Sequence, residues 1–238
     1  MTDQRSAAIQ LAASQRNQIL ADLKELVKIP SISTSQENKK DMLKAANWIA
    51  AYLTNMGMKN VQLLPTAGNP AVYGEAILDS SYPTVLIYGH YDVQPPDPME
   101  LWNSDPFEPV QDGDLLFGRG TSDMKGQILA CFAAVDATLK TGGLKANIKF
   151  ILEGEEEIGS PNLAAAIRAH KDLLACDFVL NPDTGMVGEN IPAITYGLRG
   201  LSYFEIKVTG PDHDLHSGLF GGIVHNPAQA LAEVIAAM

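Results

Sequence analysis

Apolar residues recur at helical spacing in the first quarter of the chain. Leu20, Leu23 and Val27 lie three and four positions apart, as the apolar residues on one face of an amphipathic helix do. This pattern predicts one helix over residues 5–28. The same reasoning predicts a second helix over residues 40–56, which a glycine follows.

Further along, apolar residues gather in short runs rich in β-branched side chains. Residues 84–88 form an uninterrupted run of this kind, which is typical of a strand buried on both faces. A loop rich in Pro and Asp is expected at 95–109, and a Gly-rich loop at 113–126. Because the predicted strands alternate with helices, we expect the α/β class, with a mostly parallel sheet flanked by helices. The other strands are expected at 60–64, 71–77, 147–152 and 177–180, and the helices at 127–139 and 163–170.

The pattern changes near Gly197. Residues 201–209 alternate between apolar and polar side chains, which predicts a half-exposed strand unlike the earlier ones. An amphipathic helix is expected from Pro227 to the end of the sequence, with no capping signal there. We therefore expect one domain over residues 1–197 and the truncated beginning of a smaller α+β domain over residues 198–238.

The charge balance excludes some partners. Lys and Arg number 17 against 28 Asp and Glu, a net charge of −11, whereas nucleic acids and anionic membranes attract basic surfaces. No apolar run approaches the roughly 20 residues that span a bilayer, and the first residues do not follow the pattern of a secretory signal. We expect a cytoplasmic protein without nucleic-acid or membrane partners.

Side chains that could bind metal ions follow three of the predicted strands, at the point where each strand ends. His90 comes after the strand at 84–88, Glu156 and Glu157 after that at 147–152, and Asp183 after that at 177–180. Carboxyl ends of parallel strands meet at one edge of a sheet, where ligands bind. Taken singly, each side chain also suits an ordinary loop or turn. Taken together, they predict an oxygen-rich site for two zinc-like ions.

Two further aspartates belong to this hypothesis. Asp123 lies in the Gly-rich loop before a helix, where a role as helix N-cap is about equally expected. Asp92, two residues past His90, is placed to accept the other imidazole N–H, which would fix the tautomer of the ring; the alternative is a turn-capping residue. Glu155 receives no role, and we expect its side chain to be solvated.

Four motifs in order carry a resemblance to a known family. They are Gly-His-Tyr-Asp-Val-Gln-Pro, Gly-Arg-Gly-Thr-Ser-Asp-Met-Lys-Gly, Glu-Glu-Ile-Gly-Ser and Leu-His-Ser-Gly. The chain resembles the co-catalytic zinc metallopeptidase family of carnosinase-like dipeptidases, aminoacylase, succinyl-diaminopimelate desuccinylase and glutamate carboxypeptidase. The phrases Ile-Thr-Tyr-Gly-Leu-Arg-Gly and Asp-Leu-His-Ser-Gly-Leu-Phe-Gly-Gly look closest to its cytosolic nonspecific dipeptidase branch.

The resemblance implies a role for each candidate residue. It implies hydrolysis of an amide or peptide bond in small peptides by a water that bridges two divalent ions, most often zinc, with manganese or cobalt as alternatives. Glu156 would be the general base, and a cis peptide would follow Asp123. His216 would stabilise the oxyanion in a partner's site, across a homodimer formed by a lid or dimerisation domain. The implied metal ligands are His90, Asp123 as the bridge, Glu157 and Asp183, with Asp92 orienting His90.

Two family features have no match in this sequence. They are a further histidine ligand of the second metal and a lid residue, commonly arginine, for the substrate's terminal carboxylate. This leaves open whether residues 1–238 alone are active. The alternatives are an amidohydrolase of N-acyl amino acids with the same metals, and a truncated relative that binds metal without catalysis.

Overall fold

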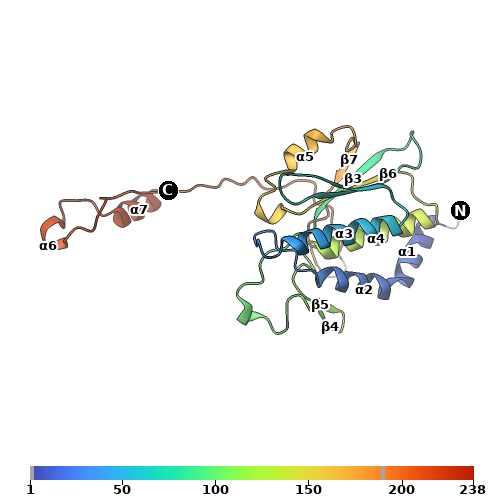
Figure 1. The fold of residues 1–238 in the computed structure, drawn as a ribbon, viewed down its shortest axis with the longest axis horizontal. Coiled ribbons are helices and arrows are strands. Elements are labelled where there is room, and N and C mark those ends of the chain that lie inside the picture. The colour runs from blue at the N-terminus through green and yellow to red at the C-terminus, as the bar shows by residue number, and fades with distance from the viewer. Residues whose placement is uncertain (1–2, 189–190) are drawn as a thin grey trace. The chain divides into compact units, whose positions relative to one another are not determined.

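Five strands form the central sheet, in the order β1-β2-β6-β3-β7 (Figure 1). In the computed structural model, which describes residues 3–188 and 191–238, this sheet belongs to the larger of two units, residues 1–192 and 193–238. The strands β6, β3 and β7 are parallel, and β1 and β2 add antiparallel pairs beside β6. The strands are β1 (Lys59–Leu64), β2 (Ala71–Ala76), β3 (Thr84–His90), β6 (Asn147–Glu153) and β7 (Phe178–Leu180).

Helices cover both faces of this sheet (Figure 1). On one face, α3 (Lys39–Asn55) packs against β1 and β2, and α4 (Lys125–Lys140) packs against β3. Phe132 of α4 and Phe150 of β6 are fully buried there and meet edge to face at 5.1 Å between ring centroids. The other face carries α5 (Leu163–Ala169). The predicted α/β fold, with a mostly parallel sheet flanked by helices, is therefore confirmed.

The prediction of one helix over residues 5–28 is wrong, because two helices are present. They are α1 (Gln4–Ser14) and α2 (Arg16–Val27), and both contact α4. The hydroxyl of Ser14 donates to the carbonyl oxygen of Leu11 at 2.7 Å, and such side-chain bonds compete with the helical pattern and bend it. The break lets both helices bury their apolar faces against α4.

Part of the predicted loops at 95–109 and 113–126 is regular. A short 3₁₀ helix, η1 (Met99–Leu101), lies in the first. A hairpin of β4 (Val110–Asp112) and β5 (Leu115–Phe117) extends into the second. Gly113 has a φ of +58° at the hairpin turn. The loop between the paired residues Asp112 and Leu115 is therefore Gly113-Asp114, and glycine at the first position of a two-residue loop is a hairpin signal, which the sequence analysis missed.

The smaller unit contains α6 (Ser217–Phe220) and α7 (Pro227–Ala236). The predicted helix beginning at Pro227 is confirmed, and the side chain of Asn226 caps it by accepting from the amide of Ala228. The predicted strand at 201–209 is wrong, since this segment is irregular. A strand needs a neighbour for its backbone groups, and no strand pairs with this segment among the described residues.

Candidate metal centre

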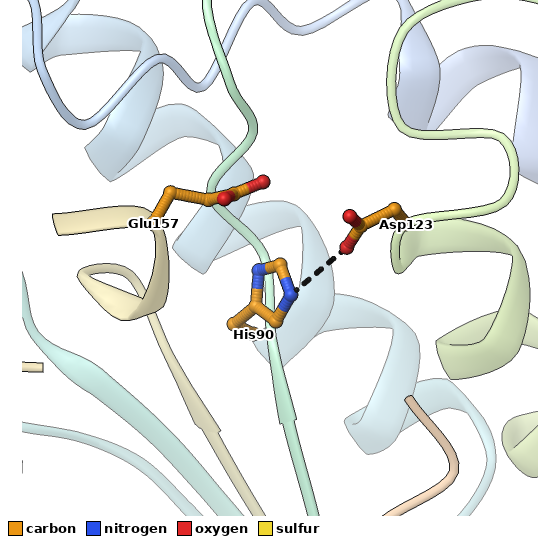
Figure 2. Close-up of side chains that lie close together, drawn as sticks. All are labelled: His90, Asp123 and Glu157. Atoms are coloured by element: carbon orange, nitrogen blue, oxygen red, sulfur yellow. Dashed lines mark ion pairs between the residues drawn. The ribbon is translucent and has the colours of Figure 1, made fainter. Parts of the chain in front are cut away.

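His90, the last residue of β3, is the centre of the candidate site. Its side chain is fully buried, and its backbone N–H donates to the sulfur of the core residue Met124 at 3.1 Å. Three carboxylates approach its Nε2 atom (Figure 2 shows Asp123). The distances from Nε2 to the nearest carboxylate oxygens are 3.2 Å for Asp123, 3.5 Å for Asp183 and 3.9 Å for Glu156.

Asp123 is presented by the turn that leads into α4. The peptide bond between Asp123 and Met124 is cis, as the resemblance implied. The buried ammonium of Lys125 donates to the carbonyl oxygens of Leu26 at 3.1 Å and Ile29 at 2.7 Å. The start of α4 is thus fastened to the end of α2. A Cβ on Gly126 would lie 2.1 Å from the carbonyl oxygen of Thr121, so this tight turn has room only for glycine.

Glu156 and Glu157 begin the short 3₁₀ helix η2 (Glu156–Ile158), directly after β6. One potential ligand atom from each of His90, Asp123 and Glu157 can be chosen so that all three atoms lie within 4.8 Å of one another. These three side chains come from β3, the loop before α4 and η2, and they face a common point (Figure 2). The structure therefore gathers ligand-type atoms from elements far apart in the sequence.

Asp92 contacts both His90 at the end of β3 and the backbone of η2. Its Oδ1 lies 3.3 Å from His90 Nδ1, and its carbonyl oxygen lies 3.0 Å from the same nitrogen. Its two carboxylate oxygens also accept the backbone N–H groups of Glu156 at 3.2 Å and Glu157 at 3.1 Å. One fully buried carboxylate therefore orients the imidazole and holds the turn that carries both glutamates.

Burial and neighbouring charges shift the pKa of several groups. Burial lowers the pKa of His90, but its hydrogen bond to Asp92 and the surrounding carboxylates outweigh this and raise it to about 9. Burial is the main cause that raises the pKa of Glu156 and of Glu157, and neighbouring carboxylates add to it. All three groups therefore hold protons more strongly than usual, because several carboxylates crowd around one imidazole.

These residues fit a metal ion. When the imidazole is neutral, the oxygens of Asp92 at Nδ1 favour the tautomer with hydrogen on Nδ1, which leaves the lone pair of Nε2 for a metal ion. Nε2 is buried and has no hydrogen-bond partner among the described residues. Three carboxylates around Nε2 attract a cation, which is either the proton that the raised pKa of His90 indicates or a metal ion that takes its place. Neutral imidazole with carboxylates is a common ligand set for divalent ions.

The structure brings six of the seven predicted site residues to one edge of the sheet: His90, Asp92, Asp123, Glu156, Glu157 and Asp183. The seventh, His216, lies exposed in the smaller unit, where its Nδ1 accepts from the amide of Gly218 at 3.0 Å. Gln94, which the sequence analysis did not single out, contacts this site as well: its side-chain amide donates to Glu157 at 2.7 Å.

The expectation that Glu155 is solvated is wrong. Its side chain is buried, and the residue is only 6% exposed. Its carboxylate accepts the backbone N–H of Asn69 at 3.2 Å and the side-chain amide of Asn162 at 2.8 Å. A Cβ on Gly68 would lie 1.8 Å from Glu155 Oε1, so this glycine makes room for the carboxylate. Glu155 therefore fastens η2 to the loop between β1 and β2.

We expect Glu155→Ala to lower the free energy of unfolding by about 2 kcal/mol, because two half-buried donors lose their acceptor. Urea denaturation followed by circular dichroism measures this as a lower transition midpoint. Glu37→Ala is the matched control, since Glu37 is exposed, and its midpoint is expected to stay within the error of the wild type. An unchanged midpoint in Glu155→Ala would contradict the structural role.

Known proteins resemble this chain over most of its length. The sequence model of Peptidase family M20/M25/M40 matches residues 86–225. The chain is 35% identical over 239 residues to the Cys-Gly metallodipeptidase dug1 of Schizosaccharomyces pombe, covering 94% of this chain and 50% of that protein. None of the described helices is both long and apolar enough to cross a membrane.

Two solved structures share the fold. The crystal structure of human carnosine dipeptidase 1 has a TM-score of 0.80 and 33% identity, covering 97% of this chain and 51% of that chain. The metallo-carboxypeptidase Sso-CP2 of Sulfolobus solfataricus has a TM-score of 0.76 and 36% identity, covering 91% and 48%. The chain therefore spans about half the length of the relatives it matches.

Proposed function

Because the chain belongs to Peptidase family M20/M25/M40, as its motifs predicted, we propose that the whole protein is a metallopeptidase that hydrolyses dipeptides or other small peptides. The observation that carries this proposal is the convergence of the carboxylates of Asp123, Glu156 and Asp183 on the buried Nε2 of His90. The residues that would hold two divalent ions, with zinc as the expected metal, are His90, Asp123 as the shared ligand, Glu157 and Asp183.

The bound ions would lower the pKa of a water molecule and polarise the carbonyl group of the substrate. Glu156 is the general base in this proposal. Its Oε2 is the most distant of the three carboxylate contacts of His90 Nε2, at 3.9 Å, and its side chain remains 40% exposed. It can therefore take a proton from water and give it to the leaving amine. Asp92 keeps hydrogen on Nδ1 of His90 and so keeps Nε2 free to bind metal.

The proposal also covers the domains of the chain and its assembly into a homodimer. We assign residues 1–197 to the catalytic domain and 198–238 to the beginning of a lid and dimerisation domain. In a homodimer, the imidazole of His216 would enter the partner's site and donate a hydrogen bond to the oxyanion of the reacting carbonyl, a contribution of a few kcal/mol for such a donor. Light scattering of the full-length protein tests the dimer, and a monomer at assay concentrations would contradict it.

The activity is tested by a direct comparison of substrates. The relatives are named as a Cys-Gly metallodipeptidase and a carnosine dipeptidase, which makes Cys-Gly and β-Ala-His suitable probes. With the full-length protein and added Zn²⁺, we expect kcat/KM for at least one dipeptide to exceed that for N-acetylated amino acids by about tenfold or more, a difference of about 1.4 kcal/mol. A reversed preference would favour the N-acyl amino acid amidohydrolase. Metal binding without turnover of any of these substrates would favour a non-catalytic relative.

A further inference from the structure

Gln94 makes a direct contact with a proposed metal ligand. Its side-chain amide nitrogen donates to Glu157 Oε2 at 2.7 Å and lies 3.5 Å from the Glu157 carbonyl oxygen. Among the described residues, no other group hydrogen-bonds to the carboxylate of Glu157. The orientation of this carboxylate is therefore set largely by one amide group.

The backbone around Gln94 explains why its side chain reaches the site. The segment after β3 is held in an extended form, because Val93 pairs with Ile32 and its amide donates to the carbonyl oxygen of Ser31 at 2.9 Å. Side chains alternate between two sides of an extended chain. Tyr91 and Val93 are fully buried on one side. His90, Asp92 and Gln94 occupy the alternate positions, and all three contact the site.

These three residues act on the site in different ways. His90 offers a ligand atom, and Asp92 holds the backbone amide of Glu157 at 3.1 Å. That bond fixes the backbone of Glu157 but leaves its side-chain torsions free. The hydrogen bond from Gln94 restrains these torsions, because it fixes one of the two carboxylate oxygens.

We propose that Gln94 is a positioning residue that holds the Glu157 carboxylate in its metal-binding orientation. The inference rests on the proposed function, since it takes Glu157 as a ligand. A donor that orients a metal ligand typically contributes 10- to 100-fold to metal affinity. Gln94 itself is exposed, so its replacement is expected to leave the stability of the fold unchanged.

Gln94→Met tests this proposal, because methionine keeps the length of the side chain but cannot donate. Zn²⁺ affinity is measured on the 238-residue chain by competition with a chelating indicator. We expect affinity to fall by about tenfold or more, with an unchanged urea midpoint. The absorption spectrum of the Co²⁺-loaded chain, which reports the coordination of the ion, is expected to change as well. Gln62→Met is the control, since Gln62 lies exposed on β1.

The outcomes separate the two proposals. Wild-type Zn²⁺ affinity and an unchanged Co²⁺ spectrum in Gln94→Met would overturn the role of Gln94 and leave the metal centre standing. A wild-type chain that binds neither Zn²⁺ nor Co²⁺ would overturn both proposals. In the full-length protein, the same variant is expected to regain most of its kcat at saturating Zn²⁺, which a direct part in the chemistry would not allow.

Discussion

Glu156→Gln is expected to lower kcat for dipeptide hydrolysis by about 1,000-fold and to leave the metal content unchanged. An amide cannot take up a proton from water, and a positioned acid or base commonly contributes 10²- to 10⁴-fold. The change removes no packing, because glutamine has the same shape and the Glu156 side chain is 40% exposed. The backbone N–H of residue 156 still donates to Asp92 at 3.2 Å, so the turn keeps its position.

The matched control for Glu156→Gln is the same substitution one position later. Glu157→Gln is expected to lose metal, because Glu157 belongs to the group of potential ligands with His90 and Asp123. Both variants are compared in the full-length protein by elemental analysis and by initial rates on Cys-Gly. If Glu156→Gln lost metal and Glu157→Gln kept it, the two roles would have to be exchanged. More than a tenth of wild-type turnover in Glu156→Gln would remove this residue from the chemistry.

Most of the site could be predicted because the ends of these strands can be located in the sequence. The apolar runs at 84–88, 147–152 and 177–180 end where β3, β6 and β7 end, within two residues. The register then places His90 beside Glu153, so the residues after both strands meet at one edge. The prediction needed only parallel neighbours, which the alternation of strands and helices indicated.

Glu155 shows what the same reasoning could not predict. Three consecutive glutamates follow β6, and their side chains point in different directions. The backbone of Glu155 has φ −145° and ψ 15°, which turns its carboxylate toward the loop around Gly68. That partner lies 86 positions away at Asn69. No local sequence pattern predicts such a contact. The hydrogen bond from Gln94 to Glu157 also joins residues far apart in the sequence, so it could not be predicted either.

The errors in secondary structure have the same origin. The alternation at 201–209 is locally typical of a strand, but pairing decides whether a strand forms, and no partner is present among the described residues. Conversely, β4 and β5 are only three residues each, too short for a clear period, so the glycine at their turn is the one local sign of the hairpin that they form. The break between α1 and α2 lies at a local side-chain hydrogen bond of Ser14, and both helices contact α4.

His90→Gln is expected to weaken Zn²⁺ binding by more than about 100-fold, since loss of a ligand exceeds the usual effect of losing a residue that only orients one. The imidazole is the only nitrogen ligand among the proposed residues, and it is fully buried. Glutamine approximates its size, but it no longer presents a lone pair fixed in place by Asp92. The measurement is the melting temperature of the 238-residue chain with and without Zn²⁺.

The melting temperature reports binding because a ligand that binds only the folded state stabilises it, by about 2.7 kcal/mol at 100 times its Kd. We expect Zn²⁺ to raise the melting temperature of the wild type, because a cation relieves the repulsion among the carboxylates around Nε2. This increase should be lost in His90→Gln and kept in His213→Gln, whose histidine is exposed. An equal increase in all three proteins would place the zinc on other residues, and Glu156 would then have no activated water to deprotonate.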